Sequence, residues 1–294
     1  MVLFWYPYGI TLPADGGWRQ RIAFSENFGA IMNRFHYTTL ACLLVTSSSA
    51  WSYSTSVETG ASAGFSSGRS LASDLNTDSH IDQDSFTSAS ASIDGYSASA
   101  FASAGVGVLK AYAGANIEKG ALDSTSYAKS LFSDTIKISG SGAARSTQIV
   151  LNFRVEGGIS GIGAASGFIN FAGGNITFAH NYYSAPVYTC DTGACDGGAV
   201  FWVPTNTELA ISGLLQVAAT ADGYGGLFDP KKRHAETDFS HTARTFISVL
   251  DPNYSLSSQS GYSYAAVPLP AATWLFVSGL GLLGFGKRRS SLAG

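Results

Sequence analysis

Apolar and polar residues alternate along several short segments in the middle of the chain. Every odd-numbered position from Ile149 to Val155 is apolar, while Asn152 and Arg154 lie between them. A spacing of two is the strand period, so this segment predicts a half-buried strand. By similar reasoning, we expect strands over residues 132–138, 167–171, 175–183, 199–203, 208–218 and 237–250. Glycine-rich turns are expected between them, at 157–158, 173–175, 197–198 and 222–223. The pattern predicts an all-β body, a β-sandwich or jelly roll, over residues 105–264.

Residues 52–104 form a segment rich in Ser, Ala and Gly, with 15 serines in residues 51–100 alone. Ser and Ala alternate with period two over 90–92 and 97–103, which favours strands. Both residue types are nevertheless poor strand formers. A flexible linker over residues 52–85 therefore stays open as an alternative.

The C-terminal part of the chain contains a long apolar run. Counting from Ala265 to Gly286 gives 22 residues without a charge, and a basic cluster of Lys287, Arg288 and Arg289 follows. A helix that crosses a bilayer needs about 20 apolar residues, so residues 271–286 predict a short transmembrane helix. The basic cluster would stay on the cytoplasmic side, and Trp274 would lie at the opposite interface.

Two prolines stand directly before this run, in Val267, Pro268, Leu269 and Pro270. The order Val-Pro-x-Pro, apolar span and Arg-rich end resembles a PEP-CTERM sorting signal, here over residues 265–294. The family's commonest residue at position 269 is Glu, where this chain has Leu. The resemblance implies that an exosortase, a membrane-embedded cysteine transpeptidase, cuts the tail of an exported protein. It also implies a Gram-negative bacterium that makes exopolysaccharide.

An exported protein needs an N-terminal signal, and the pattern of one begins at Met32. Residues 33–36 supply a positive charge, residues 37–45 are apolar, and Ser48 and Ala50 satisfy the small-residue rule for cleavage. We therefore expect a signal peptide over residues 32–51. Residues 1–31 would then precede the true start of translation, with a genuine N-terminal extension as the alternative.

Charge changes the picture of possible partners. The chain has 13% charged residues, about half the usual share, and 41 serines. Its formal charge is −3, and residues 52–266 hold 11 basic and 18 acidic residues, a charge of 11 − 18 = −7. Such a body offers no basic field for phosphates, so we expect no nucleic-acid partner.

Two cysteines remain after removal of the signal peptide, Cys190 and Cys195. In an oxidising compartment an even number of cysteines favours pairing, so we expect a small structural disulfide between them. A zinc site would need further ligands nearby, which the sequence lacks.

Catalytic motifs are weak. Residues 60–64 match the Gly-x-Ser-x-Gly nucleophile pattern around Ser62, but their Ser- and Ala-rich surroundings do not suggest the required strand and helix. The histidines His180, His234 and His241 are scattered along the chain. We expect no enzyme, and we assign no catalytic residue, metal or cofactor.

Other polar and aromatic groups leave alternatives open. Asp74, Asp78, Asp82 and Asp84 form an oxygen-rich cluster without the calcium-binding loop pattern, so a solvated loop is favoured over a calcium site. The basic run at 231–234 reads as a solvated loop tip, with an acidic polysaccharide as an alternative partner. Aromatic residues near Gly-rich loops favour packing, with sugar binding as the alternative; they are Tyr182, Tyr183, Tyr188, Trp202 and Tyr224.

Together these features predict an exported structural protein of the cell surface or extracellular matrix, associated with exopolysaccharide. Its expected partners are the secretory translocon, the exosortase and, through the tail before processing, the inner membrane. A carbohydrate-binding adhesive module and a secreted hydrolase remain the alternatives.

Overall fold

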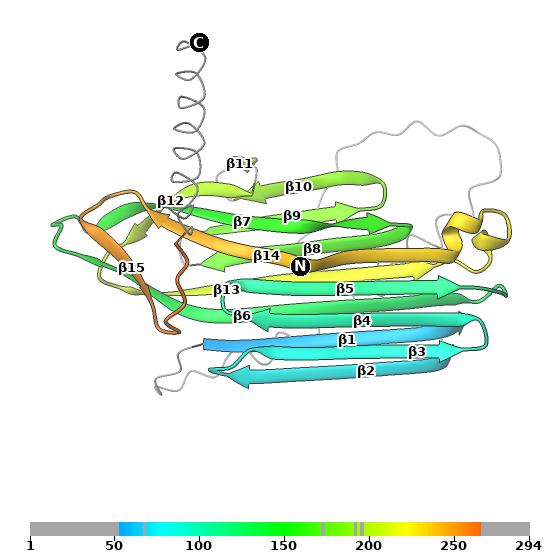
Figure 1. Cartoon of the computed structure of the whole chain (residues 1–294). Helices are drawn as coiled ribbons and strands as arrows, with labels where there is room; N and C mark the ends of the chain where they lie inside the picture. Colours follow the sequence, from blue (N-terminus) through cyan, green and yellow to red (C-terminus); the bar gives the residue numbers. More distant parts are fainter. Residues whose placement is uncertain (1–52, 67–68, 172–173, 191–192, 195–196, 266–294) are drawn as a thin grey trace, which may run out of the picture. The chain divides into compact units, whose positions relative to one another are not determined.

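The computed structural model describes residues 53–66, 69–171, 174–190, 193–194 and 197–265. These residues form two antiparallel sheets and two short 3-10 helices, so the expected all-β class is confirmed (Figure 1). Among them, no helix has the length and apolar character to span a bilayer. The expected signal peptide at 32–51 and transmembrane helix at 271–286 lie outside the described residues.

The first sheet, sheet A, has nine strands in the order β11-β10-β9-β8-β13-β6-β1-β2, and β15 also pairs with β6. Its strands are β1 (Tyr53–Ser66), β2 (Arg69–Ile81), β6 (Asp123–Gly140), β8 (Ile162–Phe171), β9 (Gly174–Asn181), β10 (Ser184–Cys190), β11 (Gly193–Ala194), β13 (Glu208–Ala221) and β15 (Tyr254–Ser258). On β6, the pairing with β1 ends at Asp134, and the pairing with β15 begins at Ile136. The first and last strands of the body therefore follow one another along a single edge of β6.

The second sheet, sheet B, has six strands in the order β12-β7-β14-β5-β4-β3. They are β3 (Ser85–Ile93), β4 (Tyr96–Gly105), β5 (Val108–Ile117), β7 (Ser146–Ser160), β12 (Gly198–Pro204) and β14 (His234–Val249). The helices η2 (Gly225–Leu227) and η3 (Pro230–Arg233) lie between β13 and β14.

The two sheets pack face to face because each strand buries every second side chain. In β13 the pattern alternates strictly, and Leu215 and Val217 are among its buried residues. Phe178 of sheet A meets Phe239 of sheet B with ring centroids 5.7 Å apart. The core cluster contains residues from both sheets. The architecture is sandwich-like, with the apolar positions of the period-two pattern turned inward.

The Ser/Ala/Gly-rich segment is an integral part of both sheets. β1 pairs with β6 along most of its length, and β4 pairs with β5. The flexible-linker alternative is therefore wrong for the described residues of 52–85. Alanines supply the inward positions here, with Ala61, Ala89 and Ala98 in one buried cluster. Small side chains from both sheets therefore form the core around this cluster. The poor strand propensity of these residues is outweighed by their burial and by strand pairing.

All seven segments expected to be strands coincide with strands, namely β6, β7, β8, β9, β12, β13 and β14, although β9 ends at Asn181 and β14 at Val249, before the expected ends at 183 and 250. The expected turn at 157–158 is wrong, because Gly157 and Gly158 lie inside β7, and the described residues of the expected turn at 173–175, Gly174 and Asn175, begin β9. Position 157 instead permits a close approach of the neighbouring strand: a Cβ there would lie 2.3 Å from the carbonyl oxygen of Asp238. The strand β14 shifts register beside this point, between Asp238 and Thr242.

Candidate functional site

The start of β1 and the end of the described chain lie beside one another, and their surroundings form the candidate site. The chain leaves β15 at Ser258 and continues through Ser260 to Tyr264, which is 1% exposed. Ala265 is exposed. The residues of the expected sorting signal follow in the sequence, and they lie outside the described residues: Val267, Pro268, Leu269, Pro270, Trp274, Lys287, Arg288 and Arg289.

A buried carboxylate, that of Asp134 on β6, holds this last segment. It is 3% exposed. Its Oδ2 accepts hydrogen bonds from Ser258 Oγ at 2.8 Å, Ser260 Oγ at 2.8 Å and the Tyr264 hydroxyl at 2.9 Å. Its Oδ1 accepts the backbone N–H of Thr135 at 2.7 Å and that of Ser260 at 3.4 Å. Five donors on one carboxylate satisfy the buried charge without a cation.

Tyr264 is fixed from several sides. Its carbonyl oxygen accepts the backbone N–H of Ile247 at 2.8 Å, and its ring packs edge-on against Tyr262. Burial and, next, the Asp134 carboxylate raise the pKa of its phenol, so the hydroxyl stays protonated and donates to Asp134. The last residues before the tail are therefore part of the packed body.

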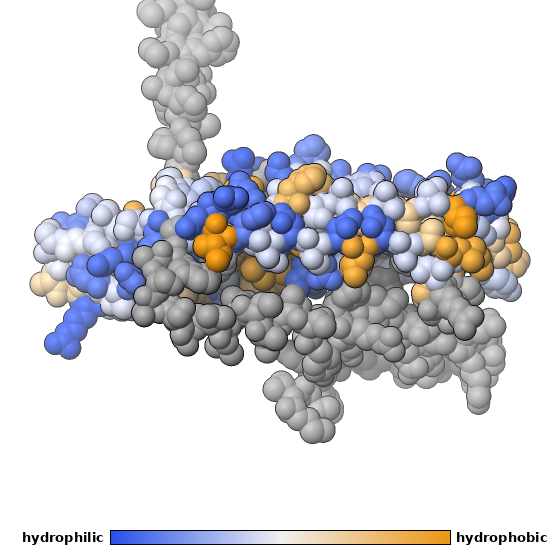
Figure 2. Space-filling model, turned by 90° about the horizontal axis from the view of Figure 1, so that it is seen from below, coloured by the Kyte–Doolittle hydropathy of each residue, from blue (hydrophilic) through white to orange (hydrophobic). Residues whose placement is uncertain are grey.

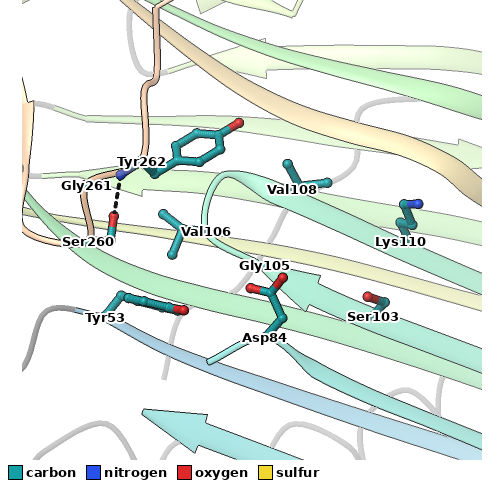
Figure 3. Close-up of a pocket in the computed structure, with 10 residues that line it drawn as sticks. All are labelled: Tyr53, Asp84, Ser103, Gly105, Val106, Val108, Lys110, Ser260, Gly261 and Tyr262. Carbon is teal, nitrogen blue, oxygen red and sulfur yellow. Dashed lines mark hydrogen bonds between the residues drawn. The ribbon is translucent and has the colours of Figure 1, made fainter. Parts of the chain in front are cut away.

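An open pocket of about 480 Å³ adjoins this anchor (Figure 3). The β4–β5 turn and the first residues of β5 form one wall, Tyr53 and Asp84 form a second, and residues 260–262 form a third. Figure 3 shows the Tyr53 ring and the Asp84 carboxylate beside Gly105. A Cβ at position 105 would lie 2.9 Å from Asp84 Oδ1, so glycine leaves room for this carboxylate.

The pocket carries both signs of charge. Among the described residues, Asp84 and Lys110 form no ion pair with each other or with another side chain. Burial and the Asp84 charge raise the pKa of the Tyr53 phenol, which therefore stays neutral. Hydroxyls, a carboxylate and an ammonium group around aromatic rings can bind a polar ligand. Among the described residues that line the pocket, none is a histidine or a cysteine.

The aspartates expected in a loop are divided between a strand and a turn. Asp74 and Asp78 lie on β2, where they accept the backbone N–H groups of Ser90 at 2.9 Å and Phe86 at 3.0 Å. Between them, Asn76 donates to the carbonyl oxygen of Ser88 at 2.7 Å. These three side chains, the Asp74–Asn76–Asp78 ladder, therefore satisfy the free edge of β3 as a neighbouring strand would.

The other two aspartates serve the β2–β3 turn and the pocket. Asp82 accepts the backbone N–H of Tyr53 at 3.2 Å, and Asp84 lines the pocket. Within the described ranges, no group of three or more His, Cys, Asp or Glu side chains could hold a metal ion. The solvated-loop interpretation is wrong for Asp74 and Asp78, because their period of two places them along a strand facing β3.

Comparison with family models, with curated proteins and with solved structures finds no match to this chain.

The Gly-x-Ser-x-Gly match lies within β1, not on a turn between a strand and a helix. Gly60 stands opposite Tyr127 of β6, and a Cβ there would lie 2.3 Å from the tyrosine ring. Gly64 has φ +66° at a register shift of the strand. Space at position 60 and backbone conformation at position 64 therefore account for the two glycines of the motif. The buried Oγ of Ser62 has no hydrogen-bond partner among the described residues, so no histidine there activates it.

The three candidate histidines lie on two different strands. His180 is on β9, packs edge-on against Phe239, and has a pKa lowered by burial. His234 lies at the start of β14, 3.7 Å from Glu236, and His241 is exposed further along this strand. The geometry joins none of them to Ser62 in a hydrogen-bonded triad, as a hydrolase of the serine type would need.

Of the two cysteines, only Cys190 lies in the described part. It ends β10, and its backbone pairs with that of Gly193 on β11. Cys195 lies outside the described residues, so the disulfide stays a prediction.

The basic run forms η3, where Arg233 donates to the carbonyl oxygens of Gly226 at 3.0 Å and Glu118 at 2.9 Å. Lys231 and Lys232 are exposed. The solvated loop tip expected here therefore describes Lys231 and Lys232, whereas Arg233 ties the loop to the body.

The candidate aromatic residues are dispersed. Tyr182 and Tyr183 are 50% and 85% exposed at the β9–β10 turn and pack against one another. Trp202, on β12, is 65% exposed, and Tyr224, before η2, is 66% exposed. Tyr188 instead packs against the buried Phe178, so for this residue the packing interpretation is confirmed.

Sequence reasoning missed the Asp134 anchor and the pocket beside it. Asp134 occupies an inward position of the strand 132–138, between Phe132 and Ile136, both buried. A charge at a core position of a predicted strand is an available signal, because a buried charge requires partners. The sequence does not reveal that Ser258, Ser260 and Tyr264 supply them, since they lie more than 120 residues away.

Proposed function

We propose that this chain is an exported structural protein of the bacterial cell surface or extracellular matrix, with a C-terminal tail that an exosortase removes. The observation that carries the proposal is the three-part tail, with two prolines, an uncharged apolar run and a basic cluster in the order of a PEP-CTERM signal. In this proposal residues 271–286 form a transmembrane helix, and residues 32–51 are removed on export.

The geometry of the body's end supports this proposal. A membrane enzyme that cuts near Val267 needs an accessible segment, and Ala265 is exposed directly after the buried Tyr264. The Asp134 network fastens the three preceding anchor residues to β6. A folded body would thus remain intact while the tail is engaged, because the anchor resists unravelling from the cut end.

The test is the mass of the C-terminal peptide from the full chain, produced in cells with and without an exosortase. We expect tail loss only in the cells that contain the enzyme. Replacing Pro268 and Pro270 by alanine should reduce processing, whereas Pro252→Ala, a matched proline change in the β14–β15 turn, should not. An intact tail in both cell types would refute the sorting proposal.

A second candidate, binding of carbohydrate, is favoured by the exposed pair of Tyr182 and Tyr183. Exposed tyrosine rings combine an apolar face with a polar hydroxyl, which suits a sugar ring. Retention on a glycan array that falls when Tyr183 becomes alanine, but not when Tyr188 does, would support this function. Failure of the chain to bind any glycan on the array would remove it.

A further inference from the structure

The edge strand β2 pairs with β1 on one side, and its other side has no strand partner among the described residues. It keeps one register with β1 from Ser54 opposite Ile81 to Ser66 opposite Arg69, with the pair at Gly64 and Leu71 missing. No strand of the described part pairs with its other side, because β2 ends the order of sheet A (Figure 1). Along the thirteen residues of β2, the backbone N–H and C=O groups that point to this side therefore lack a strand partner in the described part.

The neighbouring edge of sheet B is treated differently. The Asp74–Asn76–Asp78 ladder occupies the backbone groups of β3 at Ser90, Ser88 and Phe86. Such a cap blocks pairing with another chain. β2 contains no proline and shows no register shift in its pairing with β1, and its two carboxylates, Asp74 and Asp78, are turned inward and engaged by β3.

The outward side chains of β2 between Leu71 and Ser79 are neutral. Leu71 and Leu75 are 61% and 64% exposed, and Ser73, Thr77 and Ser79 are also exposed. Seen from the β2 side, the molecule carries hydrophobic side chains in small separate patches between hydrophilic ones (Figure 2). The charged side chains Asp74 and Asp78 point to the other face, where β3 engages them. An edge strand with one register and uncharged outward side chains, as β2 has between Leu71 and Ser79, is a template for pairing with another strand.

We propose that two copies of this chain pair through β2, antiparallel about a two-fold axis, and so join their A sheets into one continuous sheet. The axis passes through Ser73, which places Leu71 of each copy opposite Leu75 of the other and Asp74 opposite Ala72. A two-fold contact requires a strand that complements itself. This register pairs leucine with leucine and sets no carboxylate opposite another, whereas moving the two-fold axis from Ser73 to Asn76 would set Asp74 opposite Asp78.

Charge also predicts how the pairing responds to salt. Each body has a formal charge of −7 over residues 52–266, from 11 basic and 18 acidic residues, so two copies repel at long range. Because salt screens such repulsion over about 8–10 Å at physiological strength, the dimer should strengthen as ionic strength rises. A contact held by ion pairs would weaken instead.

The test measures the mass of the full chain in detergent by light scattering coupled to gel filtration. We expect a two-chain mass for the native sequence and a one-chain mass for Leu75→Lys, which places an ammonium group opposite Leu71 of the other copy. Val200→Lys, a matched change of an exposed residue on β12, should keep the two-chain mass. A one-chain mass for the native sequence, or equal loss with both variants, would overturn the proposal.

Cysteine cross-linking tests the register independently of how Leu75→Lys folds. Ser73→Cys should give a disulfide-linked dimer under oxidising conditions, because directly opposite Cα atoms of an antiparallel pair lie about 4.5–5.5 Å apart, within the range that a disulfide spans. Ser88→Cys, on the capped edge of β3, should give no more dimer than the native cysteines do. Cross-linking through Ser88 and not Ser73 would overturn the β2 contact. So would a monomer whose β2 amides resist hydrogen exchange, since another part of the chain would then cover this edge.

Discussion

Removing one hydroxyl should reveal how strongly the body holds its C-terminal segment. Tyr264→Phe keeps the ring and its contact with Tyr262 but deletes the hydrogen bond to Asp134 Oδ2, which is 2.9 Å long. A hydrogen bond to a charged group contributes about 1.5–3 kcal/mol. The phenol is 1% exposed, so water cannot replace the lost donor at Asp134 without rearrangement. We expect the free energy of unfolding to fall by about 1.5–3 kcal/mol, or the melting temperature by about 3–12 °C.

Tyr262→Phe is the matched control. This tyrosine lies two residues earlier and packs against the same ring, but it is only half-buried and does not bond to Asp134. Unfolding by urea should show a change within about 0.5 kcal/mol for this variant. Limited proteolysis after residue 258 should be faster for Tyr264→Phe than for Tyr262→Phe. Equal destabilisation by the two changes would refute the role assigned to the Tyr264 hydroxyl.

The pH dependence gives a second measurement on Tyr264. Burial raises the pKa of its phenol in the folded protein, so between about pH 10 and that raised pKa the unfolded chain loses a proton that the folded chain keeps. Its contribution to stability is therefore complete below about pH 10 and is lost as the pH rises further. Tyr264→Phe should show a shallower alkaline decline in stability than the native protein. An identical decline would mean that other groups determine it.

Three further changes test local features of the two sheets. Gly60→Ala should destabilise the protein by about 1–3 kcal/mol in urea unfolding, because the added Cβ would lie 2.3 Å from the Tyr127 ring; Gly158→Ala, with nothing within 4 Å, should cost less than Gly60→Ala. Asp78→Ala should accelerate hydrogen exchange of the Phe86 amide on β3, because this amide donates a hydrogen bond to the Asp78 carboxylate. Unchanged exchange would contradict the role assigned to the Asp74–Asn76–Asp78 ladder. His180→Gln should reduce the loss of stability that occurs as the pH falls below about 6.5. Burial lowers the pKa of the imidazole in the folded protein, so the unfolded chain binds the proton at a higher pH than the folded chain does. An equal loss of stability in acid for both proteins would contradict this role of His180.

The strands most visible in the sequence were those with large apolar residues at alternate positions. Ile149, Leu151 and Phe153 are 0–1% exposed, as the period-two pattern of β7 requires. β1 and β2 are harder to recognise because most of their inward positions hold Ala, Thr, Asp or Asn, with Val57 the large apolar residue among those described. Their place in the sheet depends on pairing with β6 and on β3, which no local window of sequence contains.

The sequence by itself determined the class of the fold and the division of the chain into apolar ends and a Ser- and Gly-rich, acidic body. Both properties are local, since side-chain period and charge can be counted along a short segment. Only the tertiary structure decided the roles of the buried and paired polar groups. Asp134 anchors residues 258–264, and Asp74 and Asp78 cap β3. These roles depend on which distant strands become neighbours, because a buried or strand-facing carboxylate is defined by the donors that folding brings to it.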